Sequence, residues 1–283
     1  MVIILNVFAL IFCSCGGQAT NKQISKMKNT IDIEKIDIVG HWQTDATVIG
    51  LDILGKSNIA NEYELLGRVQ EEDFRDDYFD GWQVQFKSDG SFESSYTSWC
   101  GNDDHHHVIG SYEYTDANHI RIYVDTIIAH FYYGGGKSGT FKLNGKELGV
   151  FLIDSIANGF RLIRTIDGET DQELLMYSDM LRNLPSITAR NWNSFKWLNL
   201  DPHNRTNDNH KILSKGLAAV GSYAPNKAKL LYSRRHDGGI IAFVFRYEKQ
   251  NLIALYSAGP EVFAVYDPAQ PPIELEKYEV EDY

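Results

Sequence analysis

The stretch Ile-Val-Gly-His-Trp-Gln-Thr-Asp, residues 38–45, decides the fold prediction for this chain. Gly40 is followed, after one intervening residue, by Trp42. From here to about residue 178 the chain contains many short segments in which apolar and polar residues alternate. Alternation with a period of two is typical of half-buried strands. The stretch therefore predicts the first strand of an antiparallel β structure.

Bulk composition restricts the class of protein. The chain has 283 residues, which is long enough for two ordinary domains. A hydrophobic content of 43% and an aromatic content of 12% indicate a folded protein. The formal net charge of -11 excludes a nucleic-acid partner, because neutralising phosphates requires a basic face.

The N-terminus indicates where in the cell the protein is sent. Residues 2–12 are apolar except for Asn6, and this run is shorter than the roughly 20 residues of a transmembrane helix. Such a run fits the hydrophobic region of a secretory signal. The following Cys-Ser-Cys-Gly-Gly, residues 13–17, makes the segment resemble a bacterial lipoprotein signal in which Cys15 is lipidated. The alternative is a buried N-terminal strand.

The lipoprotein resemblance has several implications. It divides the N-terminus into a signal peptide, residues 1–15, and a flexible tether, residues 16–30, which is polar and rich in small residues. The relaxed signal and the aromatic-rich body resemble lipoproteins of Bacteroides-like bacteria. The resemblance implies membrane attachment through the N-terminal lipid and a place in the bacterial cell envelope, at the outer membrane.

Turn residues between alternating segments predict hairpins. Residues 82–87 and 92–96 flank a turn at 88–91, and residues 111–114 and 119–131 flank a turn at 116–118. Asn144 and Gly145 separate residues 139–143 from 147–154, and Asn-Gly is the strongest short hairpin signal. Residues 160–166 predict one more strand. Many short strands joined by tight turns predict an up-and-down barrel or a sandwich.

Residues 173–178 have two interpretations. The stretch beginning at Thr170, with Glu173 three residues later, fits the capping box of a helix. We expect a closing strand instead, because several hairpins and an Asp-Gly pair precede it.

The Gly40-His41-Trp42 motif resembles the G-x-W opening of the lipocalin and calycin barrels. The resemblance implies a lipocalin-like antiparallel β-barrel over residues 31–180. It also implies that Trp42 closes one end of the barrel and that Arg164, or Arg161, packs on its ring by a cation–π contact. These residues would be structural and would not contact a ligand.

A change of composition predicts a second domain. All seven prolines come after residue 184, so we place the boundary near residues 180–186. Residues 209–220 predict a helix that begins after Asn207 or Asp208 and ends at Gly221. Strands are predicted at 228–233, 239–248, 252–258 and 261–266, and the stretch 240–245 is apolar on both faces, so it should be central. Residues 181–283 therefore predict a smaller α+β domain of no recognised family.

One segment carries residues that bind metals. Cys100, His105 and His107 lie close together in the sequence, and thiolate and imidazole ligands suit zinc. The alternative is a solvated loop between two strands. We find no nucleophile-elbow, zinc-protease or dinucleotide motif, so no residue is assigned a catalytic role.

These observations lead to three hypotheses about function. The first is a non-enzymatic, envelope-anchored lipoprotein whose barrel binds a small ligand or an envelope protein. The second is a metal-dependent enzyme that uses Cys100 and residues 105–107, with zinc as the cofactor. The third is a structural or assembly lipoprotein without a ligand cavity.

Overall fold

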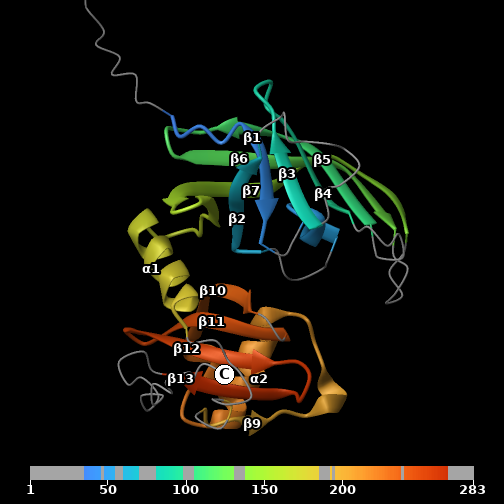
Figure 1. Ribbon diagram of the computed structural model, residues 1–283. Coiled ribbons are helices and arrows are strands. Elements are labelled where there is room, and N and C mark those ends of the chain that lie inside the picture. Colours follow the sequence, from blue (N-terminus) through green and yellow to red (C-terminus); the bar gives the residue numbers. More distant parts are fainter. Residues whose placement is uncertain are drawn as a thin grey trace, which may run out of the picture. The chain divides into compact units, whose positions relative to one another are not determined.

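The computed structural model describes residues 35–45, 48–54, 60–69, 81–97, 105–130, 138–184, 192, 195–236 and 239–266. These residues are mainly β: they form a closed eight-stranded antiparallel barrel and a five-stranded sheet, with two α-helices (Figure 1). Both parts belong to one compact unit, Glu34–Tyr283. The expected signal and tether, with Cys15, lie outside the described residues, and so does Cys100.

Eight strands make up the barrel: β1 (Gly40–Thr44), β2 (Glu62–Val69), β3 (Gly81–Phe86), β4 (Ser91–Thr97), β5 (His105–Tyr114), β6 (His119–His130), β7 (Gly139–Ile156) and β8 (Gly159–Arg164). Around the barrel the order is β1-β2-β8-β7-β6-β5-β4-β3, with β1 paired to both β2 and β3. Strands β3 to β8 are therefore a meander, whereas β2 departs from the expected up-and-down order. Short turns fix which strands are neighbours, and the longer connection between β2 and β3 does not.

The interior of the barrel is filled by side chains. Alternate residues of the strands point inward, and none of the buried core side chains is more than 8% exposed. A short 3-10 helix, η1 (Leu51–Leu54), contributes Ile53 to this core. Asp52 of η1 accepts hydrogen bonds from the Ala60 amide (2.5 Å) and the Tyr63 hydroxyl (3.0 Å), and burial raises its pKa. These bonds hold η1 against the inner wall.

The Asn144-Gly145 hairpin prediction is wrong. Both halves of the predicted hairpin belong to the single strand β7, which pairs with β6 along its length. Asn144 and Gly145 do adopt positive φ, 54° and 74°. They occupy an irregularity in the β6–β7 register between the pairs of Val124 and Thr126, which is a β-bulge. A bulge uses the same left-handed backbone as a tight turn, so the residues alone do not distinguish them. The hairpins β3–β4 and β5–β6 and the strand β8 are confirmed.

The closing strand expected at residues 173–178 is a helix, α1 (Asp171–Arg182). The Thr170 side chain accepts a hydrogen bond from the Glu173 amide, and the Glu173 carboxylate accepts one from the Thr170 amide, so the capping box is formed. Leu174, Tyr177 and Leu181 are buried on one face, at helical spacing. The capping signal was therefore the informative one.

The C-terminal sheet has the order β10-β11-β12-β13-β9. Its strands are β9 (Leu198–Asn199), β10 (Ala228–His236), β11 (Ile240–Tyr247), β12 (Gln250–Ser257) and β13 (Val262–Tyr266). The helix α2 (Asn209–Val220) has the bounds predicted from the sequence, with Asp208 as the N-cap and left-handed Gly221 as the C-cap. Two 3-10 helices, η4 (Pro202–Asn204) and η5 (Pro225–Lys227), flank α2.

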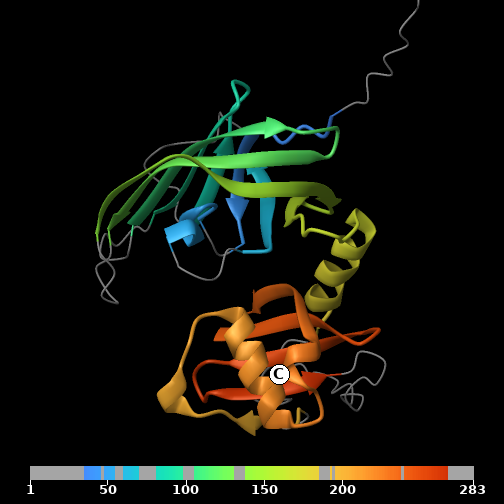
Figure 2. The same cartoon turned by 180° about the vertical axis from the view of Figure 1, so that it is seen from behind.

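Different helices pack on the two faces of this sheet. Figure 2 shows α2 in front of one face. Ala242 and Val244 of β11 pack in one core cluster with α1, and Phe243 and Phe245 pack in another with α2. The prediction that β11 is central and covered on both sides is confirmed. Neither α1 nor α2, the two α-helices of the described residues, has the length and hydropathy of a membrane-spanning helix.

Candidate functional site

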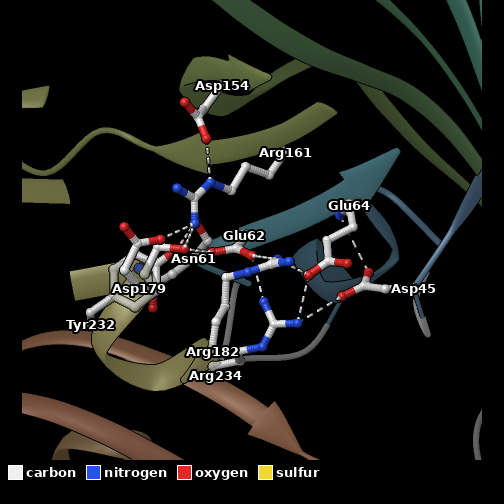
Figure 3. A network of polar contacts seen from close by, with 11 residues as sticks. Asp45, Asn61, Glu62, Glu64, Asp154, Arg161, Asp179, Arg182, Tyr232 and Arg234 are labelled. Atoms are coloured by element: carbon white, nitrogen blue, oxygen red, sulfur yellow. Dashed lines mark hydrogen bonds and ion pairs between the residues drawn. The ribbon is translucent and has the colours of Figure 1, made fainter. Parts of the chain in front are cut away.

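A network of charged side chains joins the outer wall of the barrel to α1 and β10 (Figure 3). On β2 the side chains of Tyr63 and Leu65 point into the barrel. Because side chains alternate along a strand, Glu62 and Glu64 point outward. There they meet Arg182 of α1 and Arg234 of β10. We call these residues, with Asp45, the junction network.

Glu62 is the most buried carboxylate of the junction network, with a side chain 3% exposed. Its Oε1 accepts hydrogen bonds from Arg182 Nη1 at 3.1 Å and Arg234 Nη1 at 2.5 Å. Its Oε2 accepts hydrogen bonds from the Tyr232 hydroxyl at 2.8 Å and from the Ser178 hydroxyl. Burial alone would raise the pKa of Glu62, but the two arginines and the two hydroxyls together hold it below the usual value.

Glu64 and Asp45 complete the acidic side of the junction network. Glu64 Oε1 accepts hydrogen bonds from Arg182 and, at 2.7 Å, from Arg234 Nη2. Asp45 Oδ2 is 3.7 Å from the same Arg234 nitrogen. Burial and repulsion by Glu64 outweigh the attraction of Arg234 and raise the pKa of Asp45 to about 6.

A second arginine-centred cluster extends the junction along the barrel. Arg161 of β8 is 6% exposed and points outward. Its Nε donates to Asp154 Oδ2 at 2.6 Å, and its Nη1 donates to Asp179 Oδ1 at 2.7 Å and to Ser178 Oγ at 2.8 Å. Ser178 thus connects Arg161 to Glu62. These contacts join β7 and β8 to α1.

A third polar cluster ties the connection before α1 to the C-terminal sheet. The Glu169 side chain is 1% exposed and accepts hydrogen bonds from the Tyr177 hydroxyl (2.7 Å), Arg246 Nη2 (3.0 Å) and Lys229 Nζ (3.1 Å). Burial would raise the pKa of Glu169, but these donors lower it. All these buried carboxylates have donors, so we interpret the clusters as structural joints and not as reactive groups.

Trp42 lies in the barrel core with 4% exposure, and its indole Nε1 donates to the Ile38 carbonyl at 2.9 Å. The arginine over its ring is Arg68 of β2, 5.5 Å from the ring centroid. The expected partner Arg164 instead lies over Phe151, at 5.9 Å. The contact of β8 with Trp42 is made by Phe160, at 5.4 Å between ring centroids. Arg164 is four residues further along β8, about 13 Å away at the rise of a strand.

A polar groove of about 390 Å³ crosses the outer face of the barrel. Its lining includes several histidines and a carboxylate: His41, Gln83, Glu93, His105, His107 and His130. Their inward-pointing neighbours, such as Val84, Phe92 and Val108, are buried in the core, so these polar residues lie on the opposite, outer side of the strands. His41 Nε2 is 2.8 Å from Gln83 Oε1, and burial lowers the pKa of His41.

The structure changes the setting of the expected metal ligands. His105 and His107 belong to β5 and not to a loop. No group of three His, Cys, Asp or Glu side chains within the described ranges is arranged to hold a metal ion. The sequence analysis missed Glu93 and His130, which lie in the same groove as His105 and His107.

A second groove, of about 590 Å³, lies beside α1. Leu175, Met176 and Met180 line it on the helix, and Ile253 and Tyr266 line it on the sheet. Met176 is 42% exposed. This groove is more apolar than the groove on the barrel, and it lies between α1 and the C-terminal sheet.

Replacing Glu62 tests whether the junction network stabilises the fold. Glu62→Gln removes the more buried of the two carboxylates that Arg182 and Arg234 share, so we expect the free energy of unfolding to fall by about 3 kcal/mol. Urea denaturation measures this change. The control is Glu147→Gln, because Glu147 is 53% exposed and 3.7 Å from Arg121. The control should change stability by less than about 0.5 kcal/mol. Equal losses of stability in Glu62→Gln and Glu147→Gln would contradict a stabilising role of the junction network.

Replacing Asp45 tests the direction of its pKa shift. The pKa of Asp45 is raised to about 6, so the folded chain binds this proton more tightly than the unfolded chain. The contribution of the protonated Asp45 carboxyl to the stability of the fold is therefore lost as pH rises from about 4 to about 6. We expect Asp45→Asn to gain stability relative to the native chain over this window, measured by urea denaturation.

The matched control for Asp45 is Asp89, whose pKa is lowered by hydrogen bonds from Ser91. Asp89→Asn should show the opposite slope, losing stability relative to the native chain as pH rises through the usual aspartate range. If the difference in stability between Asp45→Asn and the native chain does not vary with pH, the raised pKa of Asp45 is refuted.

Comparison of the chain with protein-family models, with curated proteins and with solved structures finds no match. The fold and the two grooves are therefore interpreted from their own geometry.

Proposed function

We propose that this chain is a non-enzymatic lipoprotein of the bacterial cell envelope, attached to the outer membrane by a lipid on Cys15. Its barrel serves as a rigid scaffold, and the chain acts by binding an envelope protein at its outer surface. The observation that carries this proposal is the filled barrel. Inward side chains from all eight strands, together with η1, occupy the space that a ligand-carrying barrel keeps for its ligand.

We propose that the barrel, residues 31–180, is lipocalin-like. Its closed set of eight antiparallel strands supports this assignment, as does the buried Trp42 with an arginine across its ring. The position of β2 and the origin of the arginine, Arg68, are departures from the expected pattern. The remaining residues, 181–283, are proposed as a smaller α+β domain, supported by α2 and its five-stranded sheet.

The small-ligand hypothesis has less support, because aromatic side chains that could line a pocket serve other purposes. Tyr112 is in the barrel core with 7% exposure, and Tyr123 bonds to Glu113 on the outer face. The metal-dependent enzyme also has less support, since His105 and His107 lie in an open surface groove and not in an enclosed cleft. A structural or assembly role is equally consistent with the filled barrel. It differs from the proposed function only in the kind of partner that the chain binds.

Native mass spectrometry tests the filled barrel. We expect the full chain, purified in detergent without a tag, to carry no bound organic molecule once lipid and detergent are accounted for. The reason is that the described core side chains from all eight strands are buried against one another. The comparison is the Phe92→Ala variant, whose new cavity should take up a small apolar probe such as benzene. An organic ligand retained by the native chain would contradict the proposal.

Cell fractionation tests the anchor. Cys15→Ala removes the thiol that carries the lipid, so we expect the chain to move from the membrane fraction to the soluble fraction. The matched control is Cys13→Ala, which keeps Cys15 and should remain with the membrane. Unchanged membrane association of Cys15→Ala would contradict the lipoprotein proposal and leave the filled barrel untouched.

A further inference from the structure

Three histidines lie together on the outer face at one end of the β5–β6 pair. His105 and His107 are alternate residues of β5, so their side chains leave the strand on the same side. His130 of β6 is directly opposite His105 in the antiparallel register. The inward side of this region is taken by Val108 and Ala129, both fully buried. All three histidines line the outer groove.

Their spacing on the sheet suits a three-histidine metal site. Directly opposed residues of an antiparallel pair have Cβ atoms about 4.5–5.5 Å apart, and alternate residues of one strand are about 7 Å apart. The three imidazoles therefore start from the corners of a small triangle fixed by backbone hydrogen bonds. Three histidines plus a water molecule are a recurrent zinc coordination, with Zn–N distances of about 2.0–2.1 Å.

A carboxylate beside the triangle provides an orienting partner. Glu93 Oε2 lies 3.2 Å from His107 Nε2, and Glu93 Oε1 accepts a hydrogen bond from Lys87 Nζ at 2.5 Å. A carboxylate that binds one nitrogen of an imidazole leaves the other nitrogen for a metal ion and makes it a better ligand. Glu93 has this relation to His107. It is itself held in place by Lys87.

The imidazoles do not converge on one point in the described conformation. The backbones of β5 and β6 are paired at these positions, so the inferred site forms by side-chain rotation on a fixed backbone. His130 is exposed, so it can change rotamer without moving the core, while His107, 40% exposed, keeps its contact with Glu93. Such rotations are fast compared with the binding of an ion.

We propose that His105, His107 and His130 bind Zn²⁺, or a divalent ion of similar preference, on the outer face of the barrel. Glu93 is the positioning residue of this site. The site uses a different part of the molecule from the lipid anchor and the filled core, so it does not rest on the proposed function. It replaces the expected Cys100 with His130 as the third ligand.

Isothermal titration of the full chain with Zn²⁺, in detergent and without a His-tag, tests the site. We expect one Zn²⁺ per chain, and a loss of affinity of at least about tenfold in each of His105→Ala, His107→Ala and His130→Ala. His203→Ala is the matched control, because His203 is exposed in η4 and should not change the affinity. Failure to bind stoichiometrically, or equal affinity in all four variants, would overturn the proposal.

Two further variants separate the roles of the neighbours. Glu93→Gln should lower the affinity by about tenfold while the absorption spectrum of bound Co²⁺ keeps the intensity of a four-coordinate site. Cys100→Ser should leave Zn²⁺ binding unchanged. Loss of binding in Cys100→Ser would overturn the three-histidine assignment. Circular dichroism of each variant should match the native chain, since the altered side chains of β5 and β6 lie outside the core.

Discussion

The arrangement of this chain depends on the hydrogen bonds and ion pairs that the Glu62 carboxylate makes. It belongs to the barrel wall, yet its partners Arg182, Tyr232 and Arg234 come from α1 and β10. Burying a carboxylate is costly unless charges and hydrogen bonds replace the lost water. Because four donors from different elements meet at one side chain, the barrel, α1 and the C-terminal sheet meet in a defined orientation.

Alternation along the strands explains why the barrel interior and its outer wall differ so sharply. In β2 the residues Tyr63 and Leu65 complete the core, and the residues next to them make the junction. In β5 the same rule buries Val108 and leaves His107 outside. The core side chains take the inward positions of the described strands, so the polar and charged groups of these strands lie on the outer wall.

Local signals in the sequence predicted local structure well. The β3–β4 hairpin and the helix α2 follow from turn residues, caps and periodicity that lie within a few positions of each other. The choice between strand and helix at residues 173–178 failed because hairpin context was given more weight than the capping box of Thr170 and Glu173. Asn144 and Gly145 mark a backbone conformation that a bulge and a turn share.

The candidate sites were harder to predict, because their residues are brought together over long distances. Glu62 and Arg234 are 172 positions apart and carry no shared motif. His105 faces His130 only because of a bulge between Ile109 and Gly110, which shifts the β5–β6 register by one residue. Without that shift His105 would face Ala129, and His130 would lie on the other side of the sheet. No rule applied to one sequence predicts such a shift.

The strand β10 is at an edge of the C-terminal sheet, next to the barrel. The side chain of Asn61 accepts hydrogen bonds from the amide of Ser233 at 3.1 Å and from its hydroxyl at 2.9 Å. An unpaired edge strand is a template on which a second chain can add, and uncontrolled addition leads to aggregation. Asn61, the residue before Glu62, thus accepts a hydrogen bond from one backbone amide of this edge, that of Ser233. The contact that orients the sheet against the barrel therefore also covers one position of this edge.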